Sequence, residues 1–208
     1  MTIQTTQAKK KHPINTDERI LVVKRSDLFP GDTWHGIKPV DLDEYLKIIE
    51  KKKQFLWRSQ MEQDPIYKQI IPYLVFKNQN KYFLMQRAAT ASEKRLRNKY
   101  SLGIGGHIRQ EDMTHSSLFA WAKREFHEEI EYNGSFKIEL IGLLNDDSNP
   151  VGRVHIGFVL LLTGDTENIQ VKSELKNGVL STLSECELVY DNLESWSQLV
   201  LEHLKNKL

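Results

Sequence analysis

Residues 101–132 read SLGIGGHIRQEDMTHSSLFAWAKREFHEEIEY, and the order of features in this segment decides the fold. A short apolar run ends in the pair Gly105-Gly106, a polar connection follows, and a pattern of helical spacing closes the segment. Apolar residues recur there at offsets of three and four, which places Phe119, Ala122, Phe126 and Ile130 on one buried face. The segment therefore predicts a strand, a glycine-rich connection and an amphipathic helix.

Acidic residues occupy a neighbouring face of the same predicted helix. Glu125, Glu128 and Glu129 have the i, i+3, i+4 relation, and like charges at these spacings repel one another. A hard divalent cation with oxygen ligands would offset this repulsion, and the carbonyl of Gly105 could complete its shell. The alternative is a solvated helix face, which is the usual meaning of a charge run. The strand and glycine pair that precede the helix favour the metal site.

These residues resemble the Nudix box of the MutT-like hydrolases, Gly-x5-Glu-x7-Arg-Glu-U-x-Glu-Glu-x-Gly-U, in which U is aliphatic. Residues 124–129 match the second half of the box, and Gly106 matches its opening glycine. The separation from Gly106 to Arg124 is four residues longer than in the box, so either Glu111 or Asp112 is left for the first acidic position. A longer connection costs little free energy.

The box shows a second departure, since Glu131 stands where a glycine is expected and Gly134 follows later. The resemblance is clearest over residues 71–157 and is closest to a Nudix subgroup described as predicted phosphoesterases. It implies an α/β fold, namely a Nudix-like α/β/α sandwich with a mixed β-sheet and an N-terminal α/β extension. The implied reaction is metal-dependent hydrolysis of a pyrophosphate bond in a nucleoside diphosphate linked to another moiety.

The resemblance also implies roles for individual residues. Mg²⁺ or Mn²⁺ would be held by Glu125, Glu128, Glu129 and the Gly105 carbonyl. Catalytic roles fall to Glu128 and Glu129, to Arg124, which orients the glutamates by ion pairing, and to Glu174 as a general-base candidate. An arginine at the end of the strand expected near residues 82–85 and basic residues in the loop after it would face substrate phosphate. These are Arg87, Arg97 and Lys99. A solvated loop is the alternative for each of them.

Composition and charge restrict the class of protein. With 39% hydrophobic and 27% charged residues over 208 positions, the chain suits a globular fold rather than a disordered one. Its net charge of +1 gives no global field for nucleic acid or a membrane, so a small-molecule diphosphate, nucleotide-derived, is the expected partner. We see no signal peptide or spanning segment and expect a cytoplasmic protein, and relatives of this family are often homodimers. The single cysteine, Cys186, excludes an internal disulfide.

Three segments are expected along the chain: a flexible N-terminal arm at residues 1–17, an N-terminal α/β extension packed on the core at 18–66, and the Nudix hydrolase domain at 67–208. Apolar runs and turn signals predict strands at 20–23, 70–76, 82–85, 136–144 and 154–162. The last of them shows little alternation and is therefore expected to be central. Helical spacing predicts a helix capped by Asp41 and a second helix at 192–208.

Several residues have competing interpretations. His155 is expected to be a hydrogen-bonded core histidine, and Asp146 and Asp147 are expected to form a turn rather than a metal site. Stacking on a base is open to four aromatic residues, Trp34, Trp57, Trp121 and Tyr73. Two other functions remain: a nucleotide sensor that does not cleave its ligand, and isopentenyl-diphosphate isomerase. The isomerase relies on a cysteine near the metal-binding strands, whereas Cys186 lies late in the chain.

Overall fold

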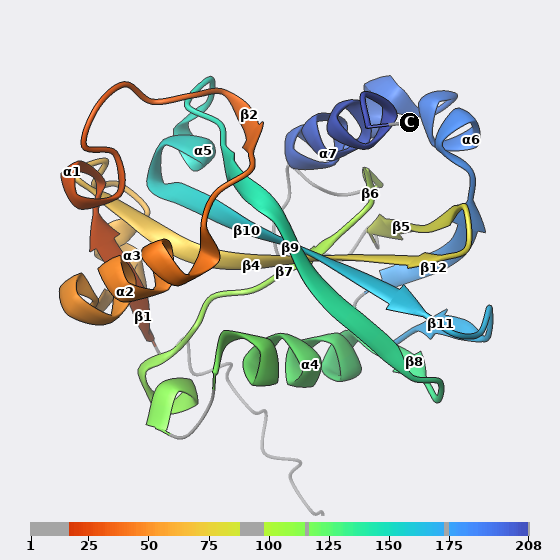
Figure 1. Cartoon of the computed structure of the whole chain (residues 1–208), viewed down its shortest axis with the longest axis horizontal. Helices are drawn as coiled ribbons and strands as arrows, with labels where there is room; N and C mark the ends of the chain where they lie inside the picture. The colour runs from red at the N-terminus through yellow and green to blue at the C-terminus, as the bar shows by residue number, and fades with distance from the viewer. Residues whose placement is uncertain (1–16, 88–97, 115–116, 173–174, 208) are drawn as a thin grey trace, which may run out of the picture.

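The computed structural model describes residues 17–87, 98–114, 117–172 and 175–207 (Figure 1). Most of the expected flexible arm, residues 1–16, lies outside this range. The candidate substrate-binding residue Arg97 and the candidate general base Glu174 also lie outside the described residues.

Strands and short helices alternate along the described chain. The elements are β1 (Arg19–Lys24), α1 (Arg25–Leu28), β2 (Gly36–Lys38), α2 (Leu42–Lys52), β3 (Gln54–Trp57), α3 (Arg58–Met61), β4 (Tyr67–Asn78), β5 (Lys81–Arg87), β6 (Tyr100–Ser101), β7 (Ile104–Gly105), η2 (Gln110–Thr114), α4 (Leu118–Glu129), β8 (Ile130–Tyr132), β9 (Phe136–Asn145), α5 (Pro150–Val154), β10 (His155–Gly164), β11 (Ile169–Val171), β12 (Leu175–Ser181), α6 (Leu183–Glu187), η3 (Tyr190–Asn192) and α7 (Ser195–Lys205). None of the described helices is long and apolar enough to cross a membrane.

The main sheet is mixed, as predicted. Its strand order is β12-β5-β4-β10-β9-β2, with β10 parallel to β4 and antiparallel to β9. Strand β10 is buried from His155 to Leu162, which confirms the central position expected from its unbroken apolar run. The remaining small sheet pairs β11 with β8.

Two helical layers cover the sheet. On β4, Leu74 and Phe76 belong to one buried cluster, while Tyr73 and Val75 belong to the other, because alternate side chains point to opposite faces. The first cluster contains the apolar side of α4, and the second contains that of α6 and α7. Figure 1 shows α4 below the sheet and α6 with α7 above it. The expected α/β/α sandwich is confirmed.

The N-terminal segment adds strands to both sides of the same sheet. Strand β1 pairs with β3 and with the beginning of β4, whereas β2 pairs with the far end of β9. A charged cluster also joins this segment to the turn before α5: Arg25 pairs with Asp147, and the buried Lys68 Nζ donates to Asp147 Oδ1 at 2.9 Å. The division of the chain at residues 66/67 stays a prediction.

The apolar pattern misplaced one boundary in each of two predicted helices. The helix expected at 192–208 begins at Ser195, because Leu193 is extended and Glu194 takes the N-cap position. Helix α4 ends at Glu129, and Ile130 is already the first residue of β8. Ile130 is nevertheless buried, so the spacing found a core residue but assigned it to the wrong element.

Candidate active site

The site lies where the edge partner of β4 changes. Strand β4 pairs with β1 through Gln69, with β7 at Tyr73, and with β5 at Asn78. After Gly105 the chain leaves β4 and crosses to β1, where Leu21 N donates to the Ile108 carbonyl at 2.8 Å. This crossing leaves the Gly105–Gly106 backbone beside the sheet, open to the helix below it.

Helix α4 brings its acidic face to this crossing. Ser117 caps the helix by accepting the Ala120 N–H at 3.2 Å, and Trp121, Ala122 and Phe126 are buried against the sheet. Phe126 stacks on Phe76 of β4 with ring centroids 5.7 Å apart. Because these apolar contacts fix the rotation of the helix, they also fix the direction in which Glu125 points.

Glu125 lies against Gly106. A Cβ atom on Gly106 would be 2.4 Å from Glu125 Oε1, so any other residue here would push the Glu125 carboxylate out of its position. Burial raises the pKa of Glu125 to about 7, and the charges of Glu128 and Glu129 add to the shift. Three carboxylates with mutual repulsion beside an open backbone segment form a donor set that suits a hard divalent cation.

Arg124 and Asp112 tie the long connection to the helix. Arg124 Nη2 donates to Asp112 Oδ1 at 2.6 Å, and Arg124 Nε lies 3.5 Å from Glu128 Oε1. Asp112 also accepts the Arg109 N–H at 2.9 Å and the Trp121 Nε1–H at 3.3 Å. Of the two acidic residues left open by the sequence, Asp112 is therefore the one that contacts Arg124.

An open pocket of about 150 Å³ adjoins the Gly105–Gly106 crossing. Its lining residues are Ile71, Tyr73, Arg87, Gly105, Gly106, His107, Asn149, Val151, Gly152, His155, Glu194, Ser195 and Trp196. The predicted residues Arg87 and Gly105 are thus brought together, and Gly106 joins them to Glu125. Through Gly106 the pocket adjoins Glu125, and Arg87 contributes a guanidinium to its lining.

Arg87 is held in this pocket by a carboxylate. Its Nε donates to Glu194 Oε1 at 2.9 Å, and both side chains are largely buried. Burial alone would lower the pKa of Arg87, but the charges of Glu194 and of Glu129 outweigh it and raise that pKa. The influence of Glu129 shows that Arg87 lies within electrostatic reach of the α4 carboxylates.

The aromatic wall of the pocket comes from Tyr73 and Trp196. Burial raises the pKa of Tyr73 to about 12, and its hydroxyl shares hydrogen bonds with Ser197 at 2.8 Å and Ser101 at 3.2 Å. Trp196 meets the Tyr73 ring edge-on at 5.5 Å and is partly exposed. Of the four aromatic residues considered from the sequence, only Tyr73 lines this pocket, while Trp121 is a core residue.

A histidine pair forms another wall. His107 Nε2 lies 3.3 Å from His155 Nε2 and 2.7 Å from Gln69 Oε1. Burial lowers the pKa of His107 well below its usual value, with help from the nearby charges of Arg58, His155 and Arg109. His155 donates from Nδ1 to the Val151 carbonyl at 2.7 Å, which confirms a hydrogen-bonded buried histidine.

Sequence reasoning missed His107, Glu194 and Trp196 as pocket residues. His107 directly follows the glycine pair, and this adjacency was the available signal. Glu194 and Trp196 reach the pocket only because α7 packs over Tyr73, a contact between residues far apart in the chain. No local pattern could have indicated it.

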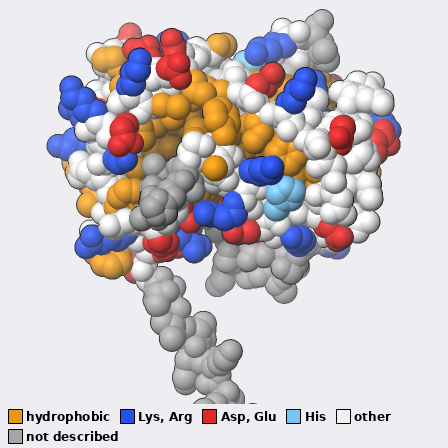
Figure 2. Space-filling model, turned by 60° about the horizontal axis from the view of Figure 1, so that its bottom comes forward, with side chains coloured by type: hydrophobic (Ala, Val, Ile, Leu, Met, Phe, Trp, Pro, Cys, Tyr) orange, Lys and Arg blue, Asp and Glu red, His pale blue; other side chains and the backbone are white. Residues whose placement is uncertain are grey.

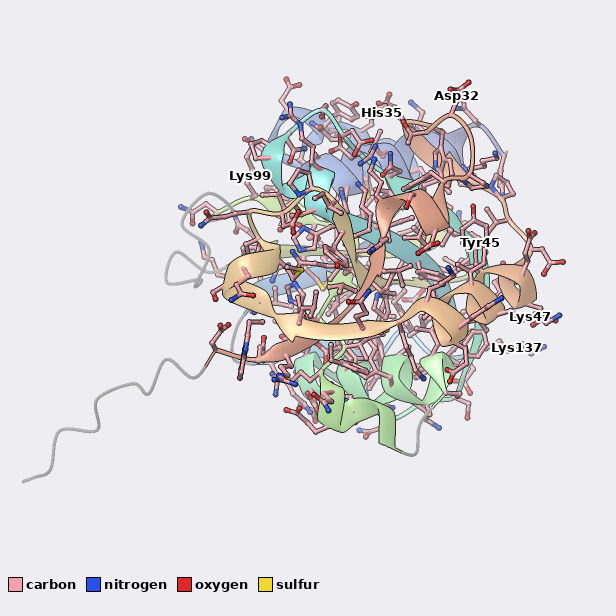
Figure 3. All side chains as sticks on the ribbon, turned by 90° about the vertical axis from the view of Figure 1, so that its left-hand side faces the viewer. Asp32, His35, Tyr45, Lys47, Lys99 and Lys137 are labelled. Atoms are coloured by element: carbon pink, nitrogen blue, oxygen red, sulfur yellow. The ribbon has the colours of Figure 1, made fainter. Side chains whose placement is uncertain are left out.

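Other candidate residues lie elsewhere. Lys99 is absent from the described pocket lining, and its Nζ donates to the Asp191 carbonyl at 3.1 Å, at the edge of the molecule in Figure 3. Asp146 accepts hydrogen bonds from Ser148 and Asn149, so the expected turn at 145–150 is confirmed. Figure 2 shows basic and acidic side chains interspersed around an area of apolar side chains on one face, in keeping with the balanced net charge.

The mixed α/β/α sandwich with an acidic helix beside a glycine pair defines a Nudix-type fold. No protein-family model matches the chain. It is 37% identical over 203 residues to protein YmaB of Bacillus subtilis (strain 168), a match that covers 91% of this chain and 98% of YmaB. The crystal structure of Tm1382, described as a Nudix hydrolase, matches with a TM-score of 0.78 and 30% identity over 92% of this chain and 100% of Tm1382. The chain belongs to the Nudix hydrolase family.

A more distant structure shows the same fold. The NUDIX domain of Shewanella oneidensis NrtR, solved with ADP ribose, has a TM-score of 0.54 and 14% identity, and the match covers 67% of this chain and 88% of that domain. About a third of this chain has no counterpart in the NrtR domain.

Proposed function

We propose that this hydrolase cleaves a pyrophosphate bond in a nucleoside diphosphate linked to another moiety, with Mg²⁺ or Mn²⁺ as cofactor. The observation that supports the proposal is the meeting of two features at the Gly105–Gly106 crossing. On one side lie the carboxylates of Glu125, Glu128 and Glu129, and on the other a pocket with the Arg87 guanidinium. A cation site and an anion-binding group on one pocket match the charges of a metal-bound diphosphate.

The acidic residues supply the metal ligands in this proposal. Glu125, Glu128, Glu129 and the Gly105 carbonyl would hold the ion, and their oxygen donors suit Mg²⁺ or Mn²⁺. When bound, such an ion neutralises phosphate charge and lowers the pKa of a water ligand. Arg124 acts as a positioning residue, since its contacts with Asp112 and Glu128 hold α4 to the long connection.

The remaining groups handle the proton and the substrate. Glu128, Glu129 or Glu174 accepts the proton of the attacking water, Glu174 being the candidate outside the described residues. Arg87 binds substrate phosphate by exchanging its contact with Glu194 for a phosphate oxygen, with Arg97 and Lys99 as further candidates. Trp196, partly exposed beside Tyr73, offers the ring face on which a base can stack.

Ligand sensing without cleavage is the second candidate function. The NrtR NUDIX domain binds ADP ribose in its crystal, which makes a nucleotide-sugar diphosphate a reasonable ligand for this pocket too. Hydrolysis is favoured because all three glutamates are present on α4 and the first of them, Glu125, lies against Gly106. The isomerase alternative is disfavoured, because Cys186 is buried in the cluster under α7 and burial raises its pKa to about 11.

The test is a panel of diphosphate compounds that includes ADP ribose, assayed for release of phosphate esters with Mg²⁺, Mn²⁺ or chelator. Glu128→Gln is compared with Glu139→Gln, an exposed carboxylate on β9. Turnover that requires metal, is lost in Glu128→Gln and survives in Glu139→Gln supports hydrolysis. Metal-dependent binding without turnover supports the sensor instead, and equal activity in both variants contradicts the role of Glu128.

A further inference from the structure

A second group of potential metal ligands consists of two residues of the pocket lining, His107 and His155, together with Glu62. His107 Nε2, His155 Nε2 and a carboxylate oxygen of Glu62 all lie within 4.8 Å of one another. The two imidazole nitrogens are 3.3 Å apart and belong to residues 48 positions apart in the chain. Glu62 directly follows α3, His107 follows the glycine pair, and His155 begins β10, so only the tertiary fold brings them together.

The spacing of the two nitrogens fits a tetrahedral ion. Zinc binds imidazole nitrogen at about 2.0–2.1 Å, so two such ligands at the tetrahedral angle are about 3.3–3.4 Å apart. The observed 3.3 Å between His107 Nε2 and His155 Nε2 matches this value. Glu62 Oε1 lies 4.0 Å from His107 Nε2, and its side chain is 35% exposed, so a small rotation brings it within ligand distance.

The histidine tautomer also fits. His155 donates its Nδ1–H to the Val151 carbonyl at 2.7 Å, which leaves the lone pair of a neutral ring on Nε2, toward His107. Metal-binding histidines regularly fix their second nitrogen on a backbone carbonyl in this way. A single His107 Nε2–H would otherwise be shared between His155 Nε2 and Gln69 Oε1.

Gln69 provides an independent sign that a ligand belongs here. The residue is fully buried on β4, and its amide oxygen lies 2.7 Å from His107 Nε2. Its Nε2 has no hydrogen-bond partner among the described residues, which is uncommon for a buried donor. An oxygen bound to an ion at this point would give that amide an acceptor.

We propose that His107, His155 and Glu62 bind one Zn²⁺ ion, separate from the hard-cation site on α4, with a further coordination position open to the pocket. Two imidazoles and one carboxylate are the ligand set of open zinc sites. Imidazole ligands favour zinc over Mg²⁺, whereas the all-oxygen set of α4 has the reverse preference. The protein would therefore hold a zinc ion at the histidine pair of the pocket and a hard cation at the α4 carboxylates.

The test measures zinc binding itself. Untagged protein freed of metal by chelator is titrated with Zn²⁺ by calorimetry and with Co²⁺ by visible absorption. One ion with the intense absorption of four-coordinate Co²⁺ is expected in the wild type. His107→Gln and His155→Gln should each weaken binding by more than about a hundredfold, since even the loss of an outer-shell partner costs up to that factor.

Two controls locate the ion. His35→Gln removes an exposed histidine on the loop before β2 (Figure 3) and should leave zinc affinity within about threefold of wild type. Glu125→Gln/Glu128→Gln should do the same. If a histidine variant does not fold by circular dichroism, Glu62→Gln at the partly exposed carboxylate takes its place. Zinc affinity unchanged in the histidine or Glu62 variants, or lost only with the α4 glutamates, overturns the proposal.

Discussion

Glu125 Oε1 occupies the space that a side chain on Gly106 would need, since a Cβ there would lie 2.4 Å from that oxygen. Gly106 matches the opening glycine of the Nudix box, and Glu125 is the first of the three glutamates on α4. It means that glycine is required at this position by the carboxylate rather than by a left-handed backbone. The position of the Glu125 carboxylate therefore depends on residue 106 having no side chain.

Gly106→Ala should reduce metal-dependent turnover by about 10–100-fold while the protein stays folded. The new methyl group displaces the flexible end of Glu125, and a misplacement of about 1 Å can cost about a hundredfold in rate. Gly31→Ala is the matched control, because nothing lies within 4 Å of a Cβ there. The comparison is made by kcat and by thermal unfolding. Equal kcat in both variants would contradict the role assigned to the Gly106–Glu125 contact.

Arg87→Gln should raise KM about tenfold or more and also destabilise the fold by about 1–3 kcal/mol, because it leaves the buried Glu194 carboxylate without its partner. Adding Glu194→Gln removes the stranded charge. The double variant should therefore regain stability without regaining substrate affinity. Urea unfolding and initial rates measure the two quantities separately.

If the double variant regains both stability and the KM of the wild type, Arg87 stabilises the fold and does not bind substrate. Lys99→Gln is the companion variant, and its ammonium contacts the Asp191 carbonyl outside the described pocket lining. We expect its effect on KM to be smaller than that of Arg87→Gln. A larger effect would assign phosphate binding to Lys99.

Trp196→Leu should raise KM for nucleotide substrates by about 10-fold and leave kcat nearly unchanged, because loss of base stacking removes about 1–3 kcal/mol of binding. Trp196→Phe retains a ring and should recover most of the affinity. The measurement is KM for a nucleoside diphosphate substrate against that for a diphosphate without a base. If the baseless compound is affected equally, Trp196 shapes the pocket and does not stack on a base.

Asp147→Asn should destabilise the protein by about 3 kcal/mol near pH 7, since it removes the partner of the fully buried Lys68. Burial lowers the pKa of Lys68 to about 8, and hydrogen bonding to Asp147 opposes that shift. Urea unfolding measures the loss. Lys68→Met/Asp147→Asn should be more stable than Asp147→Asn alone, because it buries no unpaired charge.

The same carboxyl predicts an acid dependence. Burial alone would raise the pKa of Asp147, but hydrogen bonds from Arg25, Asn145 and Lys68 outweigh it and hold that pKa well below the usual 3.8. The folded state therefore binds fewer protons than the unfolded state, so the stabilisation is complete above the unfolded pKa and is lost as the pH falls below it. Unfolding free energy should fall less steeply below pH 4 in Asp147→Asn than in wild type. Parallel curves would contradict this.

Local sequence patterns determined the layers of this protein. The apolar runs at 70–76 and 154–162 predicted two core strands, and the period near 3.6 on α4 predicted which face is buried. These features are local, since burial of one face imposes its periodicity on neighbouring residues. The Asp41 cap, whose side chain accepts the N–H groups of Asp43 and Glu44, was predictable for the same reason.

The order of the glycine pair and the glutamates in the sequence predicted that they lie together, and the contact between Gly106 and Glu125 agrees with this. Glu125 and Gly106 are 19 positions apart, and both flank one strand-to-helix connection, so their meeting follows from a single local unit. Because the connection between Gly106 and Arg124 is longer than in the Nudix box, the sequence did not decide between Glu111 and Asp112. The choice of Asp112 depended on the path of that connection over Trp121 and Arg109.

Only the tertiary structure decided the rest of the pocket. Arg87 meets Glu194 across 107 positions because the start of α7 lies at the end of β5. His107 meets His155 across 48 positions because β4 pairs with β10 and with β7. Such contacts are set by strand order and helix docking, which leave no periodic signal in either partner. The sequence alone therefore determined the fold and the acidic helix, whereas packing across the sheet decided which side chains face them.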